Sequence, residues 1–191
     1  MNKHIKKILI ILFVTISIIV AILFTYLITK YFCDKAILRK VTEIYTEDNV
    51  QNRLDNKQND LALQIDGETV LGVIRIENIA FEGLVYEGTS LSTLSKGVGH
   101  FENSPYLNGN VCLAAHNTNK FWAKLHTLHS GDKIIYQSFL GTKEYYVVNV
   151  TEISEDDWSL LENTEDNFLT LITCIKGKKN ERLCVQALEC N

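Results

Sequence analysis

Cys174, His116 and Arg182 have the residue types and positions that nucleophilic catalysis uses. Cys174 ends the apolar segment 170–174, and Arg182 begins the next β-rich segment after a short charged loop. A hairpin of this kind brings the cysteine and the arginine side by side at its open end. His116 directly follows another apolar segment, 111–115, so all three residues lie at strand ends, where loops form clefts on a rigid scaffold.

Each of these residues also has an ordinary structural explanation. A cysteine on an apolar strand is usually a small buried side chain, and Cys112 and Cys184 fit that description. A single histidine in a loop is usually solvated, and an arginine at the start of a strand is usually a surface charge. Spacing alone therefore does not identify a catalytic site.

The elements that would position these residues are short and β-rich. The predicted strands cover residues 70–76, 79–86, 98–101, 111–115, 133–137, 144–153, 168–174 and 182–188. Glycine, asparagine and aspartate separate them, and only 121–128 and 91–94 look helical. Many short strands with few helices predict a mainly β domain that forms a closed or nearly closed barrel.

The N-terminal region predicts a membrane anchor. Residues 8–28 carry no charge, and a helix of that length rises about 30 Å, enough to cross the hydrocarbon core of a bilayer. A cleaved signal peptide has a shorter apolar core and a small-residue cleavage site, which does not follow here. We therefore predict a cytoplasmic tail (1–7), a transmembrane signal anchor (8–29), an extracellular spacer (30–64) and a catalytic domain (65–191).

The spacer has its own sequence pattern, and the composition argues against some classes of partner and site. Ile37, Val41, Ile44 and Tyr45 fall at helical spacing, so the polar spacer is expected to begin with a short amphipathic helix and otherwise to be solvated. A net charge of −4 argues against a nucleic-acid partner. The five cysteines form no zinc-like cluster, and the acidic loops lack calcium-loop spacing, so we expect no metal and no cofactor.

Three ordered motifs resemble the sortase family. Residues 170–174 match its TLxTC signature at every fixed position, and Arg182 follows at the expected short interval. Residues 97–101 and 108–117 resemble the stretch that carries the sortase histidine, and 121–132 resemble the pattern that comes after it. The likeness covers about residues 71–188, and it implies a closed eight-stranded sortase-type β-barrel with short helices after one N-terminal transmembrane helix.

The resemblance also implies a role for each site residue. Cys174 would be the nucleophile, because a thioester reacts well with amines. His116 would protonate the leaving amine as an acid and deprotonate the incoming amine as a base. Arg182 would hold the substrate or the oxyanion with its fixed donors. Asn117, Thr173 and Ala115 would support the site or line the substrate groove, and Ala115 stands where the family usually has glycine.

The implied function is that of a cysteine transpeptidase in the membrane of a Gram-positive cell, with its N-terminus inside and its catalytic domain outside. It would cleave an LPxTG-like C-terminal sorting signal of surface proteins through a thioester. It would then transfer the acyl group to an amine of a lipid II-type peptidoglycan precursor and so anchor those proteins to the cell wall. The short interval between His116 and Cys174 favours a compact class, with class D ahead of class A.

Three other functions remain open at this point. Another membrane-anchored cysteine hydrolase or protease would also use a cysteine and a histidine. A pilin-polymerising sortase would transfer its acyl group to a pilin lysine instead. A non-catalytic β-barrel binding domain would carry the same cysteines without using them.

Overall fold

The computed structural model describes residues 3–55 and 62–190, and the chain divides into two compact units, Met1–Lys40 and Val41–Asn191. Helix α1 (Lys3–Ile44) runs through the first unit and ends in the second, and its large apolar side chains between Ile10 and Phe32 are exposed. Within the described residues, the stretch Ile10–Ile44 is the one helix long and apolar enough to cross a membrane. Such a stretch agrees with the predicted anchor, whose boundaries and orientation stay predictions.

The start of the second unit is more ordered than a solvated spacer. The end of α1 and helix α2 (Glu47–Asp55) lie within the predicted spacer, and Val41 and Tyr45 are buried. The Tyr45 hydroxyl donates to the Val70 carbonyl (2.8 Å) and accepts from the Leu63 amide (2.9 Å). These residues leave solvent because the helix packs its apolar side on the domain. Residues 56–61 of the spacer lie outside the described part of the chain.

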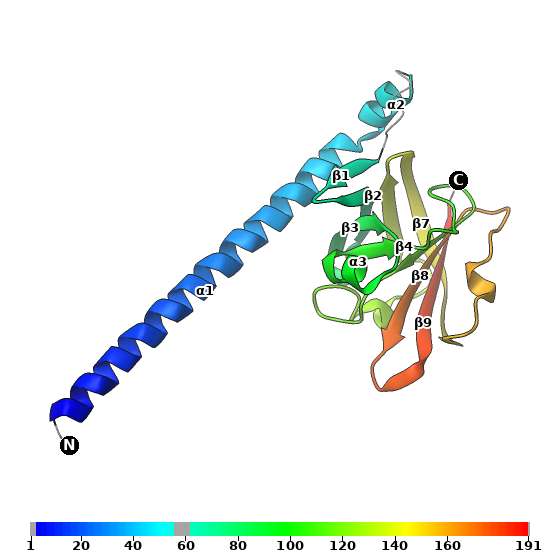
Figure 1. Ribbon diagram of the computed structural model, residues 1–191. Helices are drawn as coiled ribbons and strands as arrows, with labels where there is room; N and C mark the ends of the chain where they lie inside the picture. Colours follow the sequence, from blue (N-terminus) through cyan, green and yellow to red (C-terminus); the bar gives the residue numbers. More distant parts are fainter. Residues whose placement is uncertain (1–2, 56–61, 191) are drawn as a thin grey trace. The chain divides into compact units, whose positions relative to one another are not determined.

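The rest of the second unit is a barrel (Figure 1). Its strands are β1 (Leu63–Ile65), β2 (Glu68–Ile76), β3 (Phe81–Glu87), β4 (Val98–His100), β5 (Asn110–Ala114), β6 (Lys133–Ser138), β7 (Gly141–Ser154), β8 (Phe168–Ile175) and β9 (Lys178–Glu189). The order β2-β3-β4-β5-β8-β9-β7-β6 closes because β6 pairs with β2, and β1 adds a hairpin strand to β2. This confirms the predicted mainly β fold and its closed eight-stranded barrel.

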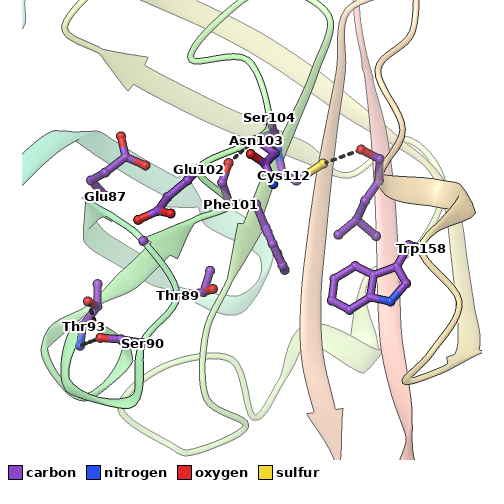
Figure 2. Close-up of a pocket in the computed structure, with 12 residues that line it drawn as sticks. Glu87, Thr89, Ser90, Thr93, Phe101, Glu102, Asn103, Ser104, Cys112 and Trp158 are labelled. Carbon is purple, nitrogen blue, oxygen red and sulfur yellow. Dashed lines mark hydrogen bonds between the residues drawn. The ribbon is translucent and has the colours of Figure 1, made fainter.

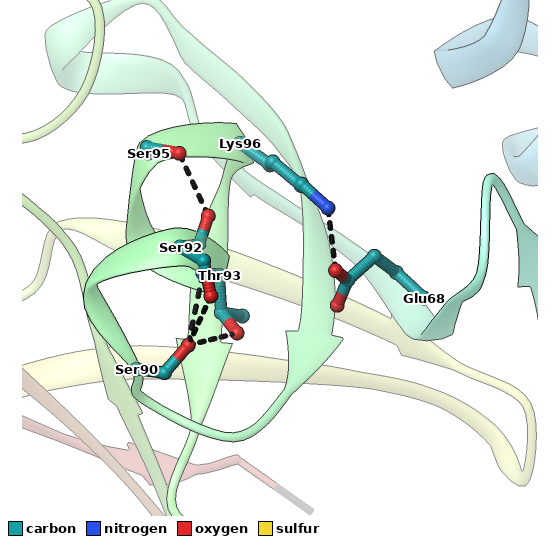
Figure 3. Close-up of polar contacts among 6 residues, drawn as sticks. All are labelled: Glu68, Ser90, Ser92, Thr93, Ser95 and Lys96. Atoms are coloured by element: carbon teal, nitrogen blue, oxygen red, sulfur yellow. Dashed lines mark hydrogen bonds and ion pairs between the residues drawn. The ribbon is translucent and has the colours of Figure 1, made fainter.

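Two neighbouring pairs in this barrel are parallel, β3 with β4 and β5 with β8. A parallel pair needs a crossover, and helix α3 (Leu91–Lys96) supplies the one between β3 and β4. Figure 3 shows how α3 begins, with the Ser90 hydroxyl accepting from the Thr93 amide at 3.1 Å, and how Lys96 pairs with Glu68 of β2. The helix predicted at 91–94 is therefore confirmed.

The other short helices are single turns. They are η1 (Glu77–Ile79), η2 (Leu125–Thr127) and η3 (Ser159–Leu161), all of the 3₁₀ type. The helix predicted over 121–128 is wrong in extent, because only the turn at η2 is helical there. Trp122 and Leu125 are fully buried in this region and belong to the core. Their burial produces an apolar spacing that looks helical in the sequence.

Alternation along β8 separates the core from the outer face of the barrel. Leu169 and Leu171 point into the hydrophobic core with the inward residues of the other strands. Successive side chains of a strand point to opposite faces, so Thr170, Ile172 and Cys174 lie on the outer face. The core therefore fixes which side of β8 presents the cysteine.

The barrel closes at Gly72 of β2, which pairs with Val85 of β3 on one side and with Ser138 of β6 on the other. A Cβ added at Gly72 would lie 2.3 Å from the Gln137 carbonyl oxygen. A Cβ added at Gly83 of β3 would instead meet the tip of the Phe81 ring at 2.7 Å. The Phe81 ring can move more easily than the paired backbone at Gln137. Of these two glycines, Gly72 is therefore the one that the pairing of β2 with β6 requires.

We expect Gly72→Ala to lower the free energy of unfolding by about 3 kcal/mol or more, the upper range for overpacking in a core. Gly83→Ala is the matched control, and its cost is expected to be smaller because Phe81 can rotate away. Denaturant unfolding of the full chain in detergent micelles measures both values. Equal costs for the two variants would contradict the role given to the β2–β6 closure.

Candidate active site

The β8–β9 hairpin places Cys174 directly opposite Arg182. Directly paired residues point to the same face of a sheet, so both side chains lie on the outer face of the barrel. Cys174 is exposed, and Arg182 is half-buried. The register shifts directly after this pair, between Cys174 and Ile175, and the last pair is Ile175 with Lys178. The structure thus brings together the two residues that the spacing predicts as neighbours.

His116 reaches the same place from β5. The parallel β5–β8 register pairs Ala114 with Ile172, and the Ala115 amide donates to the Ile172 carbonyl at 3.2 Å. β5 ends at Ala114, and His116 follows two residues later, just before Asn117, whose side chain reaches the Cys174 carbonyl. The His116 carbonyl accepts from the Thr118 and Trp122 amides, at 2.9 and 3.1 Å, which holds the turn after the histidine. The strand pairing therefore brings the segment that carries His116 to the end of β8, where Cys174 pairs with Arg182.

The three predicted supporting residues tie these strand ends together. The Asn117 amide nitrogen donates to the Cys174 carbonyl at 2.6 Å, so Asn117 holds the backbone of the cysteine. The Thr173 hydroxyl donates to the Ala115 carbonyl at 2.7 Å, and both residues are buried. Each bond joins the end of β8 to the chain that carries His116. Their contribution to a reaction stays a prediction.

Arg182 is held by its own hairpin and by one residue that the sequence did not suggest. Its Nη1 donates to the Lys179 and Glu181 carbonyls, each at 2.9 Å. Its Nη2 donates to the Glu155 carboxylate at 2.6 Å. Glu155 stands on the loop after β7, distant in sequence from Arg182, and no motif marks it. Only the pairing of β7 with β9 brings the two together.

The loop 155–167 covers part of the outer face. The Asn110 side-chain nitrogen Nδ2 donates to the Leu160 and Glu162 carbonyls, at 2.9 and 2.8 Å, and so fixes this loop on β5. Cys112 and Cys184 also point to the outer face, yet both are fully buried. This agrees with the structural explanation given for them above.

Burial changes the reactivity of these two thiols. Burial raises the pKa of Cys112 to about 12, with a smaller effect from Cys184 nearby. Burial likewise raises the pKa of Cys184 to about 12, with a smaller effect from Asp157. Because the thiolate is the nucleophile, neither is suited to react at neutral pH. Cys174 is thus the exposed thiol on this face of the described barrel.

A pocket of about 570 Å³ lies on the same face, beside the covering loop. Figure 2 shows the carboxylates of Glu87 and Glu102 on one side and the ring of Trp158 on the other. Cys112 of β5 contributes to its lining, two outward positions before His116. None of the three candidate catalytic residues lines the pocket, so the pocket does not form the candidate site.

A contact between a buried histidine and a partly exposed carboxylate supports one wall of this pocket. His100 is fully buried, and its Nδ1 lies 3.0 Å from the Glu87 carboxylate. Its Nε2 lies 3.0 Å from the Ser104 hydroxyl and 3.1 Å from the Pro105 carbonyl. Burial acts to raise the pKa of Glu87, but hydrogen bonding to His100 and its charge outweigh that effect, so the pKa is lowered.

Comparisons with known proteins agree on one family. A family model described as the sortase domain matches residues 74–189. Sortase A of Bacillus anthracis is 32% identical over 127 residues, which are 64% of this chain and 60% of that protein. Sortase D of Bacillus subtilis (strain 168) is 29% identical over 127 residues, 65% of this chain and 64% of that protein. The chain thus spans somewhat less than two thirds of the length of these relatives.

Solved structures agree with the fold. Sortase C-1 from Actinomyces oris matches with a TM-score of 0.59 and 27% identity, over 63% of this chain and 73% of that chain. A Clostridium perfringens sortase D5 transpeptidase matches with a TM-score of 0.66 and 24% identity, over 83% of this chain and 98% of that chain. The second likeness, at lower identity, supports the barrel fold alone.

We expect Thr173→Val to lower the free energy of unfolding by about 1–3 kcal/mol, because the buried Ala115 carbonyl loses its hydrogen bond while the shape of the side chain is kept. Thr142→Val on β7 is the control, since no hydrogen bond of the Thr142 side chain is found among the described residues. Denaturant unfolding measures both. A Thr173→Val variant as stable as the control would show that this bond does not hold the strand ends.

The lowered pKa of Glu87 predicts a dependence of stability on pH. A carboxyl whose folded pKa lies below its unfolded value stabilises the fold above the unfolded pKa, and this contribution is lost as the pH falls through the folded pKa. Glu87→Gln should therefore reduce the drop in Tm between roughly pH 6 and pH 3.5. Thermal unfolding across that range tests this, with Glu102→Gln in the same pocket as the control. An unchanged drop in Glu87→Gln would refute it.

Proposed function

Since the chain belongs to the sortase family, we propose that it is a cysteine transpeptidase that joins surface proteins to the cell wall. Its substrate is an LPxTG-like C-terminal sorting signal, and its acceptor is an amine of a lipid II-type peptidoglycan precursor. The observation that carries this proposal is the pairing of Cys174 with Arg182 across the β8–β9 hairpin, beside the chain end that carries His116. The burial of the other two thiols on this face supports Cys174 as the nucleophile.

The first half of the reaction forms a thioester. The Cys174 thiolate attacks the carbonyl carbon of the scissile peptide bond and gives a tetrahedral oxyanion. The N–H groups of Arg182 stabilise the negative charge on that oxygen. When the C–N bond breaks, His116 gives its proton to the leaving amine, and the acyl group remains on the sulfur.

The second half returns the enzyme to its starting state. The incoming amine attacks the thioester carbonyl, and His116 accepts a proton from its nitrogen. The C–S bond then breaks, which releases the Cys174 thiolate and a new peptide bond. Water attacking the thioester instead gives hydrolysis. An exposed site beside a covering loop admits a peptide and a second substrate in turn.

We also propose a location and a class. Residues 8–29 cross the cell membrane with the N-terminus inside, so the domain from residue 65 onward lies outside, where sorting signals and wall precursors meet. The proposed chemistry supports that orientation, because the lysines at 3, 6 and 7 are nearly balanced by Lys30, Lys35, Arg39 and Lys40 on the other side of the span. The short interval between His116 and Cys174 supports a compact class, and the Gly-Val-Gly-His run at 97–100 and the stretch with Pro105 support class D before class A.

We expect the full chain in detergent micelles to cleave peptides with LPxTG-like motifs and to attach the acyl product to an added amine. Mass spectrometry would show the amine adduct and an acyl group on Cys174. Cys174→Ala should abolish both, because Cys174 is the exposed thiol on this face of the described barrel. Cys190→Ala, which removes another exposed thiol, is the matched control and should keep full activity.

Two results would change the proposal. Cleavage without adduct formation, at any amine tested, would indicate a cysteine hydrolase. No reaction across a broad peptide library, with Cys174 unreactive towards iodoacetamide, would indicate a binding domain and refute the transpeptidase.

A further inference from the structure

Glu155 connects the loop that covers the outer face to the hairpin that carries Cys174 and Arg182. It follows directly after β7, and its amide donates to the carbonyl of Asn180, near the start of β9, at 2.8 Å. Its carboxylate accepts from Arg182 Nη2 at 2.6 Å. Backbone and side chain of one residue thus hold the same hairpin at two points.

These contacts restrict the orientation of the Arg182 guanidinium but use only some of its N–H donors. An arginine has five N–H donors in a fixed plane. The Lys179 and Glu181 carbonyls and the Glu155 carboxylate engage three of them. Among the described residues the other two N–H groups have no acceptor, so they remain available to a substrate. The plane in which they point is set by the three acceptors.

Glu155 differs from the other carboxylates around the hairpin. Lys178 pairs with Glu152 and Glu181, and all three side chains are between 43% and 49% exposed. The Arg182 and Glu155 side chains are 27% and 35% exposed, so water screens their contact less. Exposed pairs hold side chains weakly, whereas a shielded, charge-assisted bond from a fixed loop can orient a guanidinium.

We propose that Glu155 is a positioning residue for the transfer reaction, fixing the Arg182 guanidinium so that its two remaining N–H groups meet the substrate carbonyl. The inference rests on the proposed function, since it assigns Arg182 to the oxyanion. Glu155 acts through Arg182 and does not touch the reacting atoms. Oxyanion stabilisation depends on donors being in place before the charge develops, so a freely rotating guanidinium is a poorer catalyst.

Glu155 has a second, opposite effect on the thiol. Its negative charge partly offsets the positive charge of Arg182, which is directly paired with Cys174. Replacing the carboxylate with an amide leaves that positive charge uncompensated and so favours the Cys174 thiolate. Loss of Glu155 thus makes the thiol react faster with a small reagent while the enzyme transfers peptides more slowly.

The test compares Glu155→Gln with Asp156→Asn in the full chain in detergent micelles. Asp156 is the adjacent carboxylate on the same loop, exposed and without a side-chain partner among the described residues. We expect Glu155→Gln to lower kcat about tenfold to a hundredfold, less than the loss of a whole oxyanion donor, with KM changed much less. Iodoacetamide should alkylate Cys174 faster in Glu155→Gln, and Asp156→Asn should match the wild type in both assays.

A double-mutant cycle separates positioning from other roles. If Glu155 acts through Arg182, the effect of Glu155→Gln on thioester formation in a single turnover should largely vanish in an Arg182→Lys background. Additive losses in the two single variants and the double variant would overturn the inference. A Glu155→Gln variant with wild-type or higher kcat would also overturn it. So would a Glu155→Gln variant in which alkylation of Cys174 is slowed as much as peptide transfer. In each of those cases wild-type transfer leaves the proposed function intact. A wild type without any transfer overturns both proposals.

Discussion

The position of β8 between β5 and β9 is the constraint on which the site depends. β8 is parallel to β5 and antiparallel to β9, so the end of β5, the end of β8 and the start of β9 come to one edge. Cys174 lies near the end of β8, Arg182 lies opposite it within β9, and His116 follows the end of β5 by two residues. A shift of one residue in either register would turn Cys174 towards the core and away from Arg182. The arrangement of the candidate residues is therefore a consequence of strand pairing more than of any single contact between side chains.

The core enforces that register. Leu169 and Leu171 of β8 are fully buried inside the barrel, and moving them to the outer face would remove both from the core and place the Thr170 hydroxyl in it. Thr173 also points inward, and its hydroxyl donates to the Ala115 carbonyl. The buried polar side chain next to Cys174 therefore has a hydrogen-bond partner. Packing and hydrogen bonding thus agree on one register, which leaves Cys174 exposed.

The loop 155–167 divides the outer face into a covered part and an open part. It buries Cys112 and Cys184, whose raised pKa values keep them as thiols, and leaves the end of β8 accessible. The same loop contributes Trp158 to the pocket of Figure 2 and Glu155 to Arg182. One segment thus lines this pocket through Trp158 and holds the Arg182 side chain through Glu155.

The sequence by itself determined the strands, the apolar helix and the neighbours Cys174 and Arg182, because these follow from local periodicity and from one short hairpin. Strand alternation also placed Cys184 on the face of Arg182. The tertiary structure alone decided that the loop buries Cys184, that Val41 and Tyr45 pack on the domain, and that Glu155 meets Arg182. These contacts join residues distant along the chain, and no local pattern encodes them, because they arise only when β7 pairs with β9 and the barrel closes.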